Sequence, residues 1–190
     1  EQSADYLAIV TDLPIPTFRH QLYPLYKANR SEMPEEMQQQ IPMFEELIAS
    51  SNIAHLSQEG YEADDLIGTL ATQATAAGWE SFILSKDKDL MQLVNDQVHL
   101  LQLERAGMPP TIITPKEVEA KWGVPPHQLR DLLALMGDSS DNIPGVPGIG
   151  PKKGAALLKA WGSLDGILQN IPQIKAKALK SSLAASRETL

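Results

Sequence analysis

Eight acidic residues lie at the predicted ends of strands and helices, where their side chains could gather around divalent cations. In chain order they are Asp12, Glu62, Asp64, Asp65, Asp87, Asp89, Asp138 and Asp141. Carboxylate oxygens are ligands that Mg²⁺ and Mn²⁺ prefer, and acids held this close would repel one another without a cation. The chemistry that uses such a cluster is phosphodiester hydrolysis by two metal ions roughly 4 Å apart.

Each acid taken singly also has a simpler structural interpretation, as an Asx-turn former, a helix cap or a partner of the helix dipole. Glu62 and Asp65 are three residues apart and share one helix face. Asp87 and Asp89 follow a predicted strand and can point to the same side. Because eight acids share this placement, their joint pattern favours a metal site.

Residues 145–153 read Gly-Val-Pro-Gly-Ile-Gly-Pro-Lys-Lys, which predicts a phosphate-binding turn that opens onto a helix. Gly148 and Gly150 would let backbone N–H groups approach an anion at the helix N-terminus. Lys152 and Lys153 would add charge. The run resembles the hairpin of helix-hairpin-helix DNA binders, whose backbone contacts position a duplex without reading its sequence.

Residues 13–33 are rich in proline, aromatic and basic side chains and are predicted to form a loop or mobile arch. Arg19, Lys27 and Arg30 could steer a single strand or polarise a scissile phosphate, and an aromatic ring could stack on a base. A solvated loop is the alternative.

Composition narrows the class of protein. The chain has 190 residues, no cysteine, four scattered histidines and a net charge of −8, so Cys-ligated zinc and thiol catalysis are excluded. Residues 151–190 carry seven Lys or Arg against two acids, a net of +5, which leaves −13 on the rest. A basic end beside an acidic body fits a phosphate-binding surface next to a metal site, although ordinary solvated lysines would give the same count. With no apolar run of membrane length and no secretory signal, a cytoplasmic protein is expected.

The hydrophobic pattern predicts alternating strands and helices followed by a helical end, typical of an α/β fold with a mostly parallel sheet and a C-terminal helical DNA-binding subdomain. We expect a nuclease core over 1–123 and the helical subdomain over 124–190. Methionines 33, 37 and 43 and the three tryptophans are assigned to packing. Expected strands cover 6–10, 53–56, 81–85 and 98–103; expected helices cover 34–50, 62–77, 88–94, 115–122, 125–136, 151–161, 164–170 and 174 onward.

Several motifs together resemble the 5′-nuclease domains of bacterial type I DNA polymerases, a branch of the flap endonuclease superfamily with a PIN-like, resolvase-like core. The resemblance covers essentially the whole chain, in the family's order. The motifs are Thr17-Phe18-Arg19-His20, Tyr26-Lys27-Ala28-Asn29-Arg30, Gly60-Tyr61-Glu62-Ala63-Asp64-Asp65, Asp87-Lys88-Asp89-Leu90 and the run from Gly137 to Lys153.

The resemblance implies a structure-specific 5′ nuclease that removes 5′ flaps and RNA primers in replication and repair. It also implies two Mg²⁺ or Mn²⁺ ions and a K⁺ ion held by carbonyls of the 145–150 turn. Lys27 and Arg30 would act on the phosphate, Arg19 would contact DNA, and a polymerase would be attached. By the same resemblance the first metal site comprises Asp12, Glu62 and Asp64 with Asp65 close by, and the second comprises Asp87, Asp89, Asp138 and Asp141.

The family's first strand, with its own aspartate, and the helix after it have no counterpart here, so weak activity or stability of residues 1–190 alone is expected. A non-catalytic DNA-structure-binding module is the alternative function; it would need a broken acid cluster, and no matched acid position is broken. A PIN-type ribonuclease would leave the Gly-Pro-Lys-Lys turn unexplained.

Overall fold

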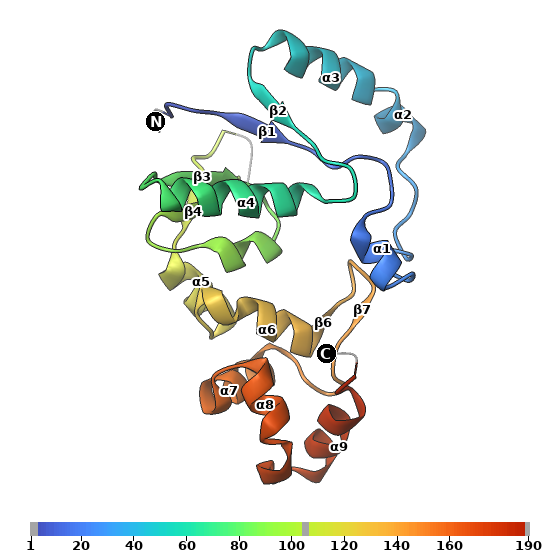
Figure 1. Cartoon of the computed structure of the whole chain (residues 1–190), viewed down its shortest axis with the longest axis vertical. Helices are drawn as coiled ribbons and strands as arrows, with labels where there is room; N and C mark the ends of the chain where they lie inside the picture. The colour runs from blue at the N-terminus through green and yellow to red at the C-terminus, as the bar shows by residue number, and fades with distance from the viewer. Residues whose placement is uncertain (1–3, 104–106, 189–190) are drawn as a thin grey trace. The chain divides into compact units, whose positions relative to one another are not determined.

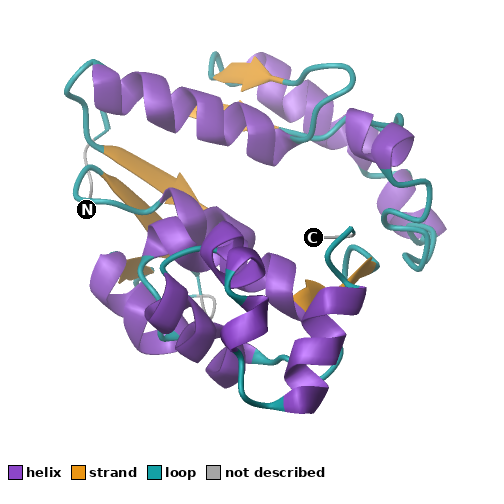
Figure 2. Ribbon diagram, turned by 60° about the horizontal axis from the view of Figure 1, so that its bottom comes forward, coloured by secondary structure: helices purple, strands orange, loops and turns teal. Residues whose placement is uncertain are grey.

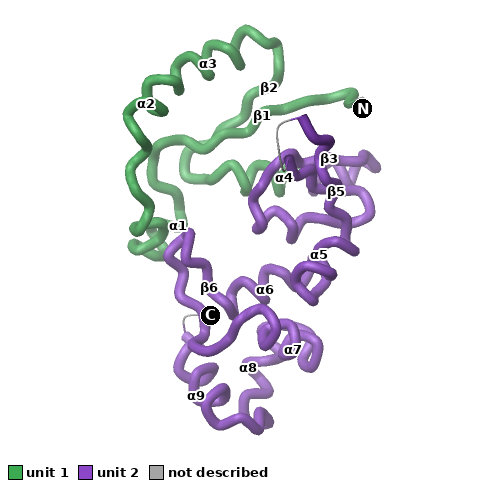
Figure 3. Tube along the Cα trace, turned by 180° about the vertical axis from the view of Figure 1, so that it is seen from behind, with its two compact units in different colours: residues 1–70 green, residues 71–190 purple. Residues whose placement is uncertain are grey.

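The computed structural model describes residues 4–103 and 107–188. Its elements are drawn in chain order in Figure 1 and by type in Figure 2. By internal contacts the chain divides into unit 1, Glu1–Leu70, and unit 2, Ala71–Leu190, which Figure 3 colours separately. No helix within the described ranges is long and apolar enough to cross a membrane.

Unit 1 is built on a parallel strand pair, β1 (Ala8–Val10) and β2 (Ala54–Leu56). Between these strands lie three helices, α1 (Phe18–Leu22), α2 (Glu35–Gln38) and α3 (Ile41–Ser50). After β2 the chain enters α4 (Ala63–Ala76), which continues into unit 2. The 13–33 segment predicted as a loop or arch therefore contains a short helix.

The single helix predicted over 34–50 is wrong, because the structure has two helices there. Pro42 occupies the start of α3. A proline inside a continuous helix would remove one hydrogen bond and clash with the carbonyl four residues earlier, here that of Gln38, the last residue of α2. The helix is therefore interrupted at Gln39 and Gln40.

The Schellman geometry at the end of α4 matches the predicted stop at Gly78. Gly78 has φ of +79°, its N–H donates to the Thr75 carbonyl at 3.0 Å, and the Trp79 N–H donates to the Ala74 carbonyl at 2.9 Å. A left-handed residue with this pair of bonds satisfies carbonyls that the helix leaves unpaired, and glycine adopts it without a Cβ penalty.

Unit 2 begins with a three-stranded sheet in the order β3-β4-β5. β3 (Ser81–Leu84) pairs in parallel with β4 (Val98–Gln102), and β4 pairs antiparallel with β5 (Thr111–Ile113). Strand β5 was not predicted. Between β3 and β4 the predicted short helix is a 3-10 helix, η1 (Asp89–Leu93).

The rest of unit 2 is helical apart from one small ribbon. Helix α6 contacts η1, α5, α7 and α8, and its Leu129, Leu132 and Leu135 are fully buried. The ribbon pairs β6 (Gly137–Asp138) with β7 (Ile143–Pro144). The helices are α5 (Pro115–Trp122), α6 (Pro126–Met136), α7 (Pro151–Trp161), α8 (Leu164–Gln169), the 3-10 turn η2 (Ile171–Gln173) and α9 (Lys177–Ala185).

The packing assignment for methionines 33, 37 and 43 is wrong within this structure, since all three side chains are exposed, Met43 at 69%. Trp79 is also half exposed. Trp122 does pack: its indole N–H points at the sulfur of the fully buried Met91, 3.3 Å away. A thioether against an indole is a favourable core contact.

Candidate active site

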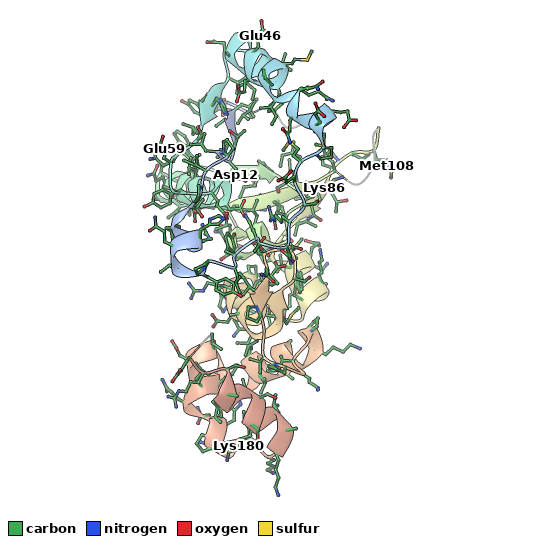
Figure 4. The ribbon with its side chains drawn as sticks, turned by 90° about the vertical axis from the view of Figure 1, so that its right-hand side faces the viewer. Asp12, Glu46, Glu59, Lys86, Met108 and Lys180 are labelled. Carbon is green, nitrogen blue, oxygen red and sulfur yellow. The ribbon has the colours of Figure 1, made fainter. Side chains whose placement is uncertain are left out.

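In unit 1 the start of α4 is fixed by two of the predicted acids. Asp12 follows β1, and its Oδ1 accepts the Ala63 N–H at 2.6 Å. Asp65 lies in the first turn and its Oδ2 accepts the Glu62 N–H at 3.0 Å. Carboxylates suit this place because the first N–H groups of a helix are unpaired and carry the positive end of its dipole. Asp64 occupies the same turn and is half-buried. Side chains are drawn in Figure 4, where Asp12 is labelled.

Arg19, on α1, makes a bidentate hydrogen bond to the Asp65 carboxylate through both terminal nitrogens of its guanidinium. Nη1 lies 2.7 Å from Oδ2 and Nη2 lies 2.8 Å from Oδ1. These hydrogen bonds from Arg19 lower the pKa of Asp65, although burial acts in the opposite direction. Bidentate pairs of this kind are among the stronger charge-assisted contacts. Arg19, predicted to contact DNA, is thus an ion-pair partner of the acid group in this structure.

Glu62 is largely enclosed, with its side chain 12% exposed. The Lys27 ammonium donates to Oε1 at 2.6 Å, and the Tyr26 hydroxyl donates to Oε2 at 2.9 Å. Arg19 Nη1 is 3.7 Å from Oε2. Lys27 has a left-handed φ of +57°, which is uncommon for a residue with a side chain. Arg30 is exposed, and its N–H donates to the Lys27 carbonyl.

In unit 2 Lys88 lies close to three of the other predicted acids, Asp87, Asp89 and Asp138. Asp87 Oδ1 accepts the Asp89 N–H at 2.8 Å, so the loop after β3 turns back on itself. From the β6–β7 ribbon, Asp138 Oδ1 accepts the Ser140 N–H at 2.7 Å. Asp138 Oδ2 accepts the Lys88 ammonium at 2.6 Å.

The negative charge of Asp89 is poorly balanced by hydrogen bonds from the protein. Its Oδ1 is buried and makes no hydrogen bond within the described part of the chain, and Lys88 Nζ is 3.7 Å away. Burial raises the pKa of Asp89, the Lys88 charge opposes this, and the charges of Asp87, Asp138 and Asp141 add to the increase. Asp87 accepts the Asp89 N–H, and Lys88 lies between Asp89 and Asp138, so these acids form one group to which the charge of Asp141 also contributes.

The pKa of Asp138 moves the other way. Burial alone would raise it, but hydrogen bonds from Lys88 and the Ser140 N–H prevail, and the pKa is lowered. Burial likewise opposes the charge on Lys88, yet the Asp138 hydrogen bond and the nearby acid charges raise the pKa of Lys88 overall. The ion pair is therefore held in its charged form.

The sequence predicts that these acids hold divalent metal ions. Over residues 4–103 and 107–188, no three His, Asp or Glu side chains are arranged to hold a metal ion in this conformation. The donor set nevertheless fits one, because it consists of hard oxygens, a buried carboxylate oxygen of Asp89 is unsatisfied, and ammonium groups lie against Glu62 and Asp138. We name the two groups the 12–65 cluster (Asp12, Glu62, Asp64, Asp65) and the 87–141 cluster (Asp87, Asp89, Asp138, Asp141).

Lys88 and Tyr26 donate hydrogen bonds to acids of these clusters, and neither was predicted as such a partner. Lys88 had a signal, since a lysine between two aspartates is available to neutralise them. Tyr26 had only its position next to Lys27, and its burial, at 5% exposed, was not visible in the sequence.

The predicted phosphate-binding turn has the expected backbone. Gly148 has φ of +82°, and a Cβ there would meet nothing within 4 Å, so glycine is required by conformation rather than by space. Gly150 is the N-cap of α7 and Pro151 its first residue. Val146 and Ile149 are buried beneath the turn, while Lys152 is exposed. Lys153 donates to the Gly148 carbonyl at 2.9 Å.

Comparison with known families covers the whole chain. Residues 1–123 match the model for the "5'-3' exonuclease, N-terminal resolvase-like domain", and residues 124–190 match the model for the "5'-3' exonuclease, C-terminal SAM fold". The chain belongs to the 5′-3′ exonuclease family.

Its curated relatives are DNA polymerases. DNA polymerase I of Rhizobium leguminosarum is 44% identical over 184 residues, which is 95% of this chain and 17% of the relative. The thermostable DNA polymerase I of Thermus filiformis is 40% identical over 190 residues, 100% of this chain and 22% of the relative. The chain thus spans about a fifth of the length of these relatives.

Solved structures share the fold. The T5 D15 protein co-crystallised with metal ions superposes with a TM-score of 0.84 at 24% identity, covering 98% of this chain and 73% of the other. The catalytic core of Rad2 in complex with DNA substrate gives a TM-score of 0.59 at 15% identity, covering 96% and 58%. The α/β core with a helical C-terminal part predicted from sequence is confirmed.

Proposed function

We propose that this chain is a metal-dependent 5′ nuclease that hydrolyses phosphodiesters at 5′ flaps and RNA-primed ends, and that it acts in the cytosol as part of a DNA polymerase I. The buried, unsatisfied Asp89 oxygen within a group of four acids carries the proposal, because a structural acid would have found a partner inside the protein. Family membership over the full chain supports it. The relatives that match are DNA polymerases I, and one neighbour is a flap endonuclease in complex with DNA and metal ions.

In this proposal the 12–65 and 87–141 clusters would each hold a divalent ion, Mg²⁺ or Mn²⁺. Bound there, the ions would supply an activated water and stabilise charge on the transferring phosphate. Glu62 and Asp138 would serve as ligands once their lysine partners withdraw. Asp65 would fix the start of α4 and keep Glu62 and Asp64 in place. Lys27, released from Glu62, and the exposed Arg30 would contribute positive charge at the phosphate.

The 145–153 turn would bind the duplex backbone. Its backbone N–H groups and Lys152 meet the requirements of a phosphate contact at a helix N-terminus. The carbonyls of residues 145–150 would bind K⁺; the Gly148 carbonyl already accepts a cation, the Lys153 ammonium. We assign residues 1–123 to the nuclease core and 124–190 to the DNA-binding subdomain.

Single-turnover cleavage of a 5′-labelled flap, with Mg²⁺ and with EDTA, tests the function. We expect metal-dependent cutting by this chain, or by a form extended at its N-terminus with the corresponding segment of a relative. Tight flap binding with no cutting by either form would support a DNA-structure-binding module instead. Cutting that persists in EDTA would reject the two-metal chemistry.

A further inference from the structure

The Lys88 ammonium lies between two acids of the 87–141 cluster, Asp89 and Asp138. It lies between Asp87 and Asp89 in sequence, yet its ammonium reaches Asp138, fifty residues later, at 2.6 Å. The same ammonium is 3.7 Å from the buried Asp89 Oδ1. One lysine thus links the loop after β3 to the β6–β7 ribbon.

The contact with Asp138 has the length of a strong hydrogen bond, and the contact with Asp89 does not. An ammonium donates along three directions on a flexible stem and cannot coordinate several carboxylates as a divalent ion does. Lys88 therefore satisfies one acid and leaves the other oxygen unbonded. A divalent ion held by Asp138 would need the carboxylate oxygen that the ammonium now contacts.

Charge balance gives the lysine a role when metal is absent. Four acids at short range destabilise one another, and burial adds to the effect at Asp89. A tethered positive charge reduces that repulsion and keeps the ribbon close to the loop. The same charge repels an incoming cation and competes with it for Asp138.

We propose that Lys88 is a resident counter-cation of the 87–141 cluster, which holds Asp89 and Asp138 together in the metal-free protein and is displaced when a divalent ion binds. The inference rests on the proposed function, because it takes this cluster to be a metal site. It assigns Lys88 a positioning role and predicts that this lysine lowers metal affinity while it stabilises the metal-free fold.

The test is a Mg²⁺ titration followed by NMR at the amides of Asp89 and Ser140, whose N–H groups donate to Asp87 and Asp138. These two signals report this cluster alone. We expect Lys88→Met to tighten Mg²⁺ binding by about tenfold, since one competing positive charge is removed, and to lower the melting temperature of the metal-free chain. Lys88→Arg should retain the wild-type affinity within about threefold, because the charge remains.

Lys86→Met is the matched control: Lys86 is two residues away and exposed, and its side chain is labelled in Figure 4. Its Mg²⁺ affinity should equal that of the wild type. Unchanged or weaker Mg²⁺ binding by folded Lys88→Met would overturn the role of Lys88.

A second measurement needs no variant. In the wild type, the Lys88 ammonium signal should show a hydrogen-bonded, slowly exchanging group before Mg²⁺ is added and a solvent-exchanging one at saturation. A Lys88 signal that stays protected at saturating Mg²⁺ would contradict displacement.

Failure of the two proposals is distinguishable. If the wild type shows no Mg²⁺-dependent shifts of the Asp89 and Ser140 amide signals and cuts no flap, both the metal site and the proposed role of Lys88 are rejected. If the wild type binds Mg²⁺ and cuts, but Lys88→Met binds no more tightly, only the inference about Lys88 is rejected.

Discussion

Arg19 and Asp65 form a two-armed ion pair that joins α1 to the first turn of α4, with N–O distances of 2.7 and 2.8 Å. The same carboxylate accepts the Glu62 N–H, so one acid anchors both a helix start and an arginine from forty-six residues earlier. Arg19 also lies over the Phe18 ring, 4.6 Å from its centroid. The pair therefore stabilises the segment that carries Tyr26 and Lys27.

Removing either partner of this pair should lower stability, and the effects of removing both should not be additive. Arg19→Ala and Asp65→Asn should each lower the free energy of unfolding, and the double variant should lose less than their sum by about 1 kcal/mol, a value kept small because both side chains are partly exposed. Urea unfolding of the four proteins measures this coupling. Arg19→Lys is the control for geometry: it keeps the charge without the fork and should recover only part of the loss. Strict additivity would show that the pair is not a unit.

Gly154, on α7, lies where α7 crosses α6. A Cβ at this position would be 2.5 Å from Leu132 Cδ1, and Leu132 is fully buried. Gly154→Ala should therefore destabilise the chain by about 1–3 kcal/mol, even though alanine is the better helix former. Thermal unfolding checks this value.

Leu132→Val provides the matched rescue for that substitution. The smaller side chain opens space for the new methyl group, so the double variant should be more stable than the sum of the single effects predicts. A Gly154→Ala protein as stable as the wild type would show that the α6–α7 contact relaxes at no cost.

The two lysines of the 145–153 turn should together strengthen duplex binding. Lys152 is exposed at the start of α7, whereas Lys153 also holds the Gly148 carbonyl. Replacing both with alanine should weaken duplex binding and reduce the slope of log K against log salt by about 0.9 for each DNA phosphate that the turn no longer neutralises. Lys116→Ala, on α5, serves as the control and should leave the slope unchanged. A slope that does not move in the double variant would argue against phosphate binding by this turn.

The sequence was sufficient for most of the elements and for the placement of the acids at element ends, because both depend on local pattern. The N-cap of α5 at Thr114 and the glycine stop at Gly123 follow from residue types with known backbone preferences. Pro42 alone would have been enough to predict the break between α2 and α3. Strand β5 was missed, although β1 and β2, which are equally short, were predicted.

The ion pairs could not be predicted in the same way. Lys27 with Glu62 and Lys88 with Asp138 join residues that are 35 and 50 positions apart. Such contacts are set by how the elements pack, which one sequence without that packing does not specify. For the same reason the sequence did not show that Asp138 accepts hydrogen bonds from Lys88 and Ser140 while Asp89 Oδ1 accepts none from the described residues, although both acids lie at an element end.

The capping box of α5 gives a pH-dependent prediction away from the clusters. Glu117 accepts the Thr114 N–H at 3.0 Å and also the Thr114 hydroxyl, and these bonds lower its pKa. Since the folded pKa lies below the unfolded one, the stabilisation is fully present above the ordinary carboxyl pKa and is lost as pH falls through the folded value. An NMR titration of the Glu117 carboxyl should show the lowered pKa, and Thr114→Val should move it back upward. An identical titration in that variant would remove the hydroxyl as a cause.

Asp89→Asn should lower turnover and raise stability at once. The substitution keeps the size of the side chain but removes a negative charge that burial and three neighbouring acids disfavour, so the metal-free chain should unfold at a temperature a few degrees higher. If Asp89 binds a divalent ion, the same change should reduce single-turnover flap cleavage by about 100-fold or more while flap binding in EDTA stays within about threefold.

Asp96→Asn, at an exposed position outside both clusters, is the matched control and should alter neither cleavage nor stability. Full cleavage activity in Asp89→Asn would exclude this acid from the reaction, whereas lost cleavage together with lowered stability would indicate that Asp89 supports the fold rather than a cation. Only a fall in cleavage together with a rise in unfolding temperature shows that the Asp89 charge destabilises the fold and is needed to bind an ion.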